Sequence, residues 1–177
     1  RFEKITGATP ANCLLFGSPS KLLDGSTTEN QLMEMLKMGY ARRCFFGYAR
    51  KPTKVRHLSA DEVLDQWYDS ANDAFMEQLS DKLGLLADMV NVNKEILIPQ
   101  DSIKYLIEYK LDCERRAAPL NDNEAIKRSE LEHRYFKVMK LAGAYAFIDC
   151  SPEITIGHIE NAIKLAEDSG KAFVQLL

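Results

Sequence analysis

The sequence predicts an α+β protein that is predominantly α-helical, with a small sheet edge in residues 1–57 and a helical bundle in residues 58–177. Three observations support this prediction. Short apolar runs bounded by glycine and proline, typical of buried strands, mark the first part. Apolar residues at helical spacing dominate the second part. A basic, proline-containing segment lies between the two parts and marks a domain boundary.

In the first part we expect two short strands with a helix between them. Residues 12–16 carry apolar side chains on both faces, and the glycine and proline that follow end the run. Thr28 and Gln31 have the spacing of a capping box, which opens a helix that ends at Gly39. The run 44–48 is rich in β-forming residues and is the second expected strand.

A long helix is expected at the start of the second part. Ser59 and Glu62 form a capping box at its beginning, and Gly84 marks its end. Because residues three and four positions apart share one face of a helix, its apolar residues form a core-facing stripe. The residues of this stripe are Leu64, Trp67, Ala71, Phe75 and Leu79.

Three further helices are expected, after a small strand at Ile96–Ile98. The helix that begins at Glu124 is apolar nearly all round in its last two turns, so we expect it to be the central and most buried one. Thr155 is the expected N-cap of the last helix. The three predicted ranges are 101–117, 124–148 and 155–173.

Composition excludes several classes of protein. With 46% apolar and 28% charged residues and a net charge of −3, the chain has neither the composition of a disordered protein nor a global basic field. The four cysteines are far apart and predict neither a disulfide framework nor a metal site. The longest apolar run, residues 141–148, is too short to span a bilayer, so we expect no membrane partner and a cytoplasmic location. No histidine lies in a nucleophile motif, which disfavours independent hydrolase chemistry.

The sequence contains no Gly-x-x-x-x-Gly-Lys-Ser/Thr phosphate loop. It also begins with Arg1 rather than methionine, which is typical of a piece of a longer protein. We therefore expect that any nucleotide this chain acts on is held mainly by residues outside it.

Arg42 and Arg43 are the candidate catalytic residues. A planar, permanently charged guanidinium pairs bidentately with phosphate oxygens and neutralises the charge that develops on a transferred phosphoryl group. Neighbouring residues at the start of a strand project to opposite sides, so only one of the two can enter a given cleft. The alternative is that both are surface arginines beside an edge strand.

Ser18 and Ser20 are the candidate nucleotide-sensing residues. They follow the first expected strand, and strand ends of open α/β sheets face the ligand crevice. A hydroxyl at this place can contact a γ-phosphate or position its attacking water. The alternative is a turn in which a serine caps a free backbone N–H.

A dense basic cluster is the candidate contact with nucleic acid. Its residues, Arg50, Lys51, Lys54 and Arg56, lie between the two expected domains. Such a cluster binds phosphates without sequence specificity, and the alternative is a solvated linker. The charges on the later helices, among them Glu130, Arg134 and Lys137, are interpreted as solvated faces.

The chain resembles a family of phage and mobile-element replication proteins. These are helicase-primase or primase-polymerase polypeptides whose helicase part is a P-loop ATPase, either RecA-like or superfamily III-like. The first part resembles the C-terminal edge of the ATPase core, and the second part resembles the helical domain that follows it. The residues that carry the resemblance are 14–19, 22–25 and 39–47 in the first part and 128–129, 138–142, 154–155 and 162–166 in the second.

This resemblance implies the C-terminal portion of an NTP-driven DNA helicase, with ATP and Mg²⁺ bound mainly by residues outside the chain. The strand ending at Ser18 would be a sensor strand, and Arg42 or Arg43 would reach the nucleotide of a neighbouring subunit in a ring-shaped homo-oligomer. DNA is the other implied partner. A noncatalytic helical module that binds DNA or a replication partner is the first alternative, and a purely structural assembly domain is the second.

Overall fold

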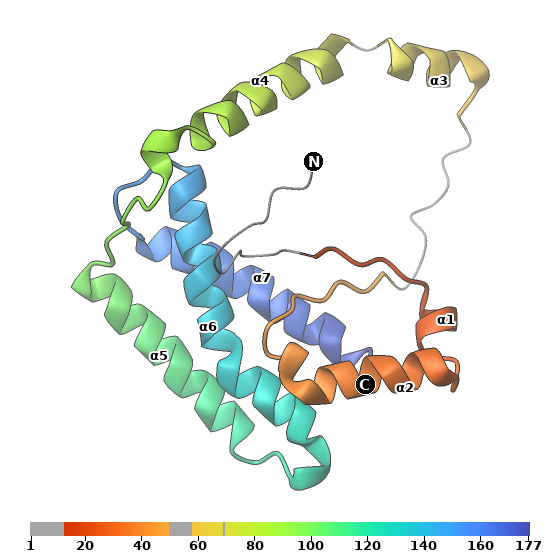
Figure 1. The fold of residues 1–177 in the computed structure, drawn as a ribbon, viewed down its shortest axis with the longest axis vertical. Coiled ribbons are helices and arrows are strands. Elements are labelled where there is room, and N and C mark those ends of the chain that lie inside the picture. Colours follow the sequence, from red (N-terminus) through yellow and green to blue (C-terminus); the bar gives the residue numbers. More distant parts are fainter. Residues whose placement is uncertain (1–12, 50–57, 69) are drawn as a thin grey trace, which may run out of the picture.

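The computed structural model describes residues 13–49, 58–68 and 70–177, and this part of the chain consists of helices and connecting loops (Figure 1). The helices are α1 (Pro19–Leu22), α2 (Thr27–Met35), α3 (Ala60–Trp67), α4 (Ser70–Leu86), α5 (Gln100–Ala117), α6 (Ala125–Ile148) and α7 (Ile156–Val174). The short helical turns are η1 (Leu36–Tyr40), η2 (Met89–Asn91) and η3 (Asp122–Glu124). None of the helices in the described ranges is long and apolar enough to cross a membrane.

Helices α5, α6 and α7 form the helical body, in which α6 packs against both of the others. Alanines spaced four residues apart on α6 and α7 keep the side chains at the contact small, which favours close approach of the two backbones. The prediction of a central, buried helix is confirmed for α6, which also begins and ends within one residue of the expected range. The buried core of the body comprises Leu106, Val138, Ala142, Ala146, Ile154, Ile159, Ala162 and Ala166.

One end of the body is closed by an isolated parallel bridge. The backbone N–H of Leu97 donates to the carbonyl of Pro152 at 3.0 Å, and the N–H of Ile154 donates to the carbonyl of Leu97 at 2.8 Å. The expected strand at Ile96–Ile98 is therefore reduced to this bridge. The hydroxyl of Thr155 accepts from the N–H of His158, which confirms the predicted N-cap of α7.

The segment α2–η1 packs against the helical body near the C-terminal end of α7. Leu36 and Ala41 are buried together with Phe173, and the rings of Phe46 and Phe173 lie 4.8 Å apart. The predicted capping box at Thr28 is wrong, because the side chain of Ser26 caps α2 instead. Gly39, the predicted end of the helix, lies instead at a kink inside η1, which continues to Tyr40. Its φ of 101° is a conformation that glycine adopts without the steric cost of a Cβ.

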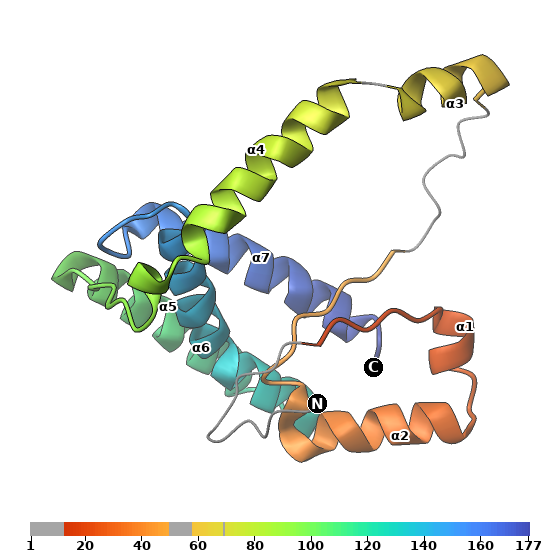
Figure 2. The same cartoon turned by 45° about the horizontal axis from the view of Figure 1, so that its top comes forward.

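Helices α3 and α4, which we call the arm, extend away from the helical body (Figures 1 and 2). The predicted capping box at Ser59 and Glu62 is confirmed, with both reciprocal hydrogen bonds present. The expected single helix is instead two helices, because α3 ends at Trp67, and the second, α4, continues past Gly84 to Leu86. Its expected core-facing residues are not in a core, because Leu64, Trp67, Phe75 and Leu79 are all exposed.

The expected sheet edge, and with it the α+β class, is wrong for the described residues, which contain no strand. A strand needs a neighbour that accepts and donates its backbone hydrogen bonds, and an apolar run alone does not supply one. Leu14, Leu15 and Phe16 are 76–89% exposed rather than buried. In the second run, the N–H of Phe46 donates to the side-chain hydroxyl of Ser169 at 2.7 Å, not to a strand.

Candidate functional site

The helical body contains a buried ionic cluster on α6. Glu130, Arg134 and Lys137 lie at positions i, i+4 and i+7 and are only 1%, 6% and 4% exposed. One carboxylate oxygen of Glu130 accepts from Lys137 Nζ at 2.6 Å, and the other accepts from Arg134 Nη2 at 2.6 Å. The prediction that these residues form solvated faces is therefore wrong.

Glu167 of α7 extends this cluster to α5. Its carboxylate accepts from Arg134 Nη1 at 3.0 Å, and from both terminal nitrogens of Arg116 at 3.0 and 2.9 Å. The hydroxyl of Tyr109 donates to the same carboxylate at 2.7 Å. A Cβ on Gly170 would overlap the Arg134 guanidinium, so a glycine at this position of α7 leaves room for the ion pairs. Charged hydrogen bonds thus join all three helices of the body.

The electrostatics of the cluster favour its ionised form. Burial opposes ionisation of Glu167, but hydrogen bonds from Arg116 and Tyr109 and the charge of Arg134 outweigh it and lower the pKa of this carboxyl to about 2. Burial and the neighbouring Glu167 raise the pKa of Tyr109. Burial also raises the pKa of the nearby Cys113 thiol, which removes it as a nucleophile at neutral pH.

The cluster carries no sign of chemistry of its own. Among the described residues, no buried side-chain nitrogen or oxygen lacks a hydrogen-bond partner. In the same part of the chain, no group of three or more histidine, cysteine, aspartate or glutamate side chains is placed to hold a metal ion. A fully paired network of this kind stiffens the structure around it, so we interpret the cluster as a scaffold.

This scaffold holds the arginine turn, which we define as residues 40–46. Lys137 Nζ donates to the carbonyl of Cys44 at 3.0 Å and approaches that of Ala41 at 3.4 Å. It also lies 5.7 Å and 5.9 Å from the ring centroids of Phe45 and Phe46. Because Ser169 accepts the N–H of Phe46, α6 and α7 both fix the backbone of the turn.

Arg42 and Arg43 are presented differently by this turn. The Arg42 guanidinium folds back over Gly39, so that a Cβ added to Gly39 would lie 3.0 Å from Nε and Nη2 of Arg42. Arg42 is partly buried, whereas Arg43 is exposed. Neither forms an ion pair with the described residues. Of the two candidates, Arg43 has its charged group open to a ligand.

Ser18 and Ser20 lie apart from the two arginines. Both are exposed, and the hydroxyl of Ser20 donates to that of Ser18 at 3.4 Å. The backbone carbonyl of Ser18 accepts from the N–H groups of Lys21 and Leu22 in the first turn of α1. Helix α1 adjoins the start of α2, while the arginine turn follows η1 at the other end (Figure 1). At 1.5 Å per residue, α2 and η1 together place about 20 Å of helix between the two serines and the two arginines.

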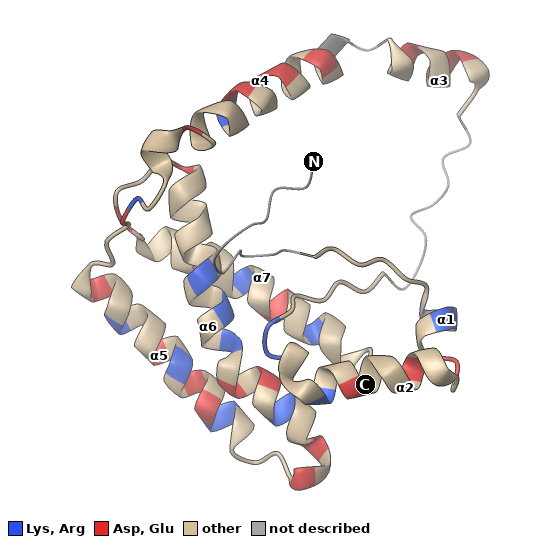
Figure 3. Cartoon of the chain, viewed as in Figure 1, with Lys and Arg blue, Asp and Glu red and all other residues tan. Residues whose placement is uncertain are grey.

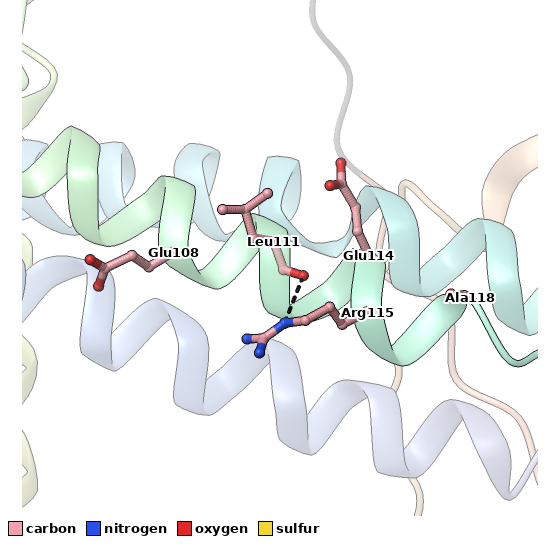
Figure 4. Close-up of a pocket in the computed structure, with 5 residues that line it drawn as sticks. All are labelled: Glu108, Leu111, Glu114, Arg115 and Ala118. Carbon is pink, nitrogen blue, oxygen red and sulfur yellow. Dashed lines mark hydrogen bonds between the residues drawn. The ribbon is translucent and has the colours of Figure 1, made fainter.

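Two other regions of the chain bear on a binding site. The basic cluster at Arg50, Lys51, Lys54 and Arg56 lies outside the described residues. On α5, a hollow of about 520 Å³ is lined by one helix only, and Figure 4 shows Arg115 lying along it with its Nε donating to the carbonyl of Leu111 at 3.4 Å. A hollow with walls from a single helix does not surround a ligand. Its lining residues are Glu108, Leu111, Glu114, Arg115 and Ala118.

The buried ionic cluster is what sequence reasoning missed. The signal in the sequence was a carboxylate followed by two cations at positions i, i+4 and i+7. These three residues share the side of α6 that carries the buried Val138. Comparison with known proteins adds no further assignment: no protein-family model, curated protein or solved structure matches the chain. The helicase interpretation therefore stays a prediction from the motifs of the sequence.

Proposed function

We propose that this chain is the C-terminal portion of an NTP-driven DNA helicase of phage-type replication, and that it supplies Arg43 in trans to a nucleotide held by another subunit. ATP and Mg²⁺ would be bound mainly by residues outside the chain, and the oligomer would surround or track DNA. The observation that carries the proposal is the anchoring of the arginine turn by Lys137. Its ammonium donates to the backbone carbonyls of Ala41 and Cys44, which lie on either side of the two arginines.

This anchoring suits an arginine finger for a physical reason. A guanidinium that stabilises a transition state acts most strongly when its position is fixed before the reaction. Lys137 and Ser169 fix the backbone of the turn, so only the Arg43 side chain itself remains to be ordered. We assign Arg42 a packing role over Gly39. The sequence left open which arginine is the finger, and we assign that role to Arg43.

The test is ATP hydrolysis by the full-length polypeptide in the presence of single-stranded DNA. We expect R43A to lower kcat by about 10³-fold or more, which is the scale of a lost arginine finger. R43K keeps the charge but loses the planar fork, and we expect it to recover little of the rate. R42A should change the rate by less than about tenfold, because a packing contact does not act on the transition state.

K37A is the matched control, because Lys37 is an exposed cation of η1 that is paired with Glu34. It should leave hydrolysis unchanged. If R43A hydrolyses ATP at the wild-type rate while folding normally, Arg43 is not a finger and the proposal fails.

The second candidate function is a noncatalytic helical module that binds DNA or a replication partner. The satisfied buried network favours it, since no buried side-chain nitrogen or oxygen among the described residues is left without a hydrogen-bond partner. Binding of single-stranded DNA to the chain would then weaken steeply as salt rises, because phosphate contacts release counterions. Salt-independent binding or none at all would leave the assembly role as the remaining alternative.

A further inference from the structure

The arm presents apolar side chains to solvent. It extends away from the helical body in Figures 1 and 2, and the principal contacts between helices of the described ranges include neither α3 nor α4. On α4, Phe75, Met76 and Leu83 are 55–62% exposed. An unsupported helix of 17 residues is only marginally stable in water, so α4 gains stability when its apolar face is covered.

The apolar face of α4 has the spacing of a coiled coil. Five of its residues follow one another at intervals of four, three, four and three positions, which places them on one line along the helix. We call this line the seam, and its residues are Asn72, Met76, Leu79, Leu83 and Leu86. Each side chain of such a seam inserts between four side chains of a facing helix. The spacing therefore indicates another helix as the cover, and the arm of a second copy is a helix with the same seam.

The acidic residues of the arm lie away from the seam. Asp73, Glu77 and Asp81 recur at every fourth position on the opposite side of α4, and Figure 3 shows acidic residues running along both helices of the arm. A second arm packed on the seam leaves these carboxylates in water. Residues 60–86 nevertheless contain seven acidic residues and one lysine, so two arms repel each other at long range. Salt screens this repulsion.

The exposed area of the arm is sufficient for a dimer. Its large apolar side chains are 38–78% exposed on the apolar sides of the two helices: Leu64, Trp67, Phe75, Met76, Leu79 and Leu83. If a fully exposed large side chain offers about 150–250 Å², one arm presents on the order of 500–850 Å². Two arms that cover each other then bury about 1,000–1,700 Å², which overlaps the range of about 1,200–2,000 Å² of specific, stable interfaces.

We propose that the arms of two copies pack antiparallel, seam against seam, about a two-fold axis. The contact is isologous: a surface meets its own copy, so the two sides match in length, area and apolar character. Charge favours the antiparallel order, because six of the seven acidic residues in 60–86 precede Leu79, whereas Lys82 follows it. The acid-rich half of each arm then lies beside the lysine-bearing half of the other. This inference stands whether or not Arg43 acts on a nucleotide.

The test compares two variants with the same added charge. L79D/L83D places two carboxylates in the seam, whereas the matched control A74D/G84D places two on the opposite side of α4, where a Cβ on Gly84 meets open space. In sedimentation velocity the wild type and the control should dimerise. L79D/L83D should associate about 100-fold more weakly or less, because an unpaired charge is costly to desolvate in an apolar contact. Raising the salt from about 50 to about 500 mM should strengthen the wild-type dimer, since it screens the acidic arms.

Mixing the seam variant with the wild type decides what the arm covers. Fluorescently labelled L79D/L83D should sediment as a monomer in an excess of unlabelled wild type, because an arm–arm contact needs two intact seams. If the wild type captures the labelled variant, its arm covers some other surface that the variant retains, and the proposal is overturned. A wild-type chain that stays monomeric at about 100 μM and high salt would also overturn it, as would L79D/L83D dimerising like A74D/G84D.

Discussion

Replacing Lys137 by methionine removes the ammonium that joins α6 to the arginine turn. Glu130 keeps its hydrogen bond from Arg134 at 2.6 Å but loses the one from Lys137, which is equally short. The carbonyls of Ala41 and Cys44 also lose their donor. Breaking a buried ion pair from one side costs about 3–5 kcal/mol. Because Arg134 still compensates part of the Glu130 charge, we expect a loss near the lower limit, about 3 kcal/mol in the free energy of unfolding.

Urea unfolding followed by circular dichroism measures this loss. The double variant E130Q/K137M removes the charge on both sides, so it should lose clearly less than the sum of the two single variants. Hydrogen exchange supplies a local measure that remains valid if the global loss is large. The amides of Cys44 and Phe46 should exchange faster in K137M, since the turn is released from α6. A loss below about 1 kcal/mol, the scale of an exposed ion pair, would refute the claim that Lys137 is a buried anchor.

Two smaller effects follow from the same scaffold. S169A deprives the N–H of Phe46 of its acceptor at 2.7 Å and should cost about 1 kcal/mol, with faster exchange of the Phe46 amide; unchanged exchange would show that the hydroxyl does not hold the turn. The free energy of unfolding should also fall at low pH because of Glu167. Its folded pKa of about 2 lies below that of an unfolded glutamate, so its stabilising contribution is present above about pH 5 and is lost as the pH falls towards 2. E167Q should flatten this loss in unfolding curves recorded from pH 6 to pH 2, and an identical slope in both proteins would contradict the ion-pair assignment.

Local signals in the sequence predicted the helices well. The capping residues Ser59 and Thr155 act on backbone groups within one turn, so their sequence pattern alone defines the beginning of α3 and α7. The kink at Gly39 was predictable as a break in its helix, because a positive φ favours glycine, although η1 continues to Tyr40. These features depend on neighbours three or four residues away.

Features that depend on distant partners could not be predicted in the same way. An apolar run such as 13–16 becomes a strand only if another strand pairs with it. The apolar face of the arm has the pattern of a core helix, and periodicity does not say whether the covering surface belongs to the same chain. Glu130 and Lys137 had the pattern of a solvated face, and only the packing of α7 and the arginine turn over them makes them buried.

Mixed oligomers test the trans role of Arg43 most directly. On the proposed function, full-length R43A copies would retain nucleotide binding but lack the arginine, whereas copies with an inactivated phosphate-binding loop would retain Arg43 but not bind ATP. If Arg43 acts across a subunit boundary, the second kind donates its arginine to the sites of the first, and the mixture should hydrolyse ATP at least about tenfold faster than either variant alone. Hydrolysis equal to the average of the two separate variants would contradict the proposed function.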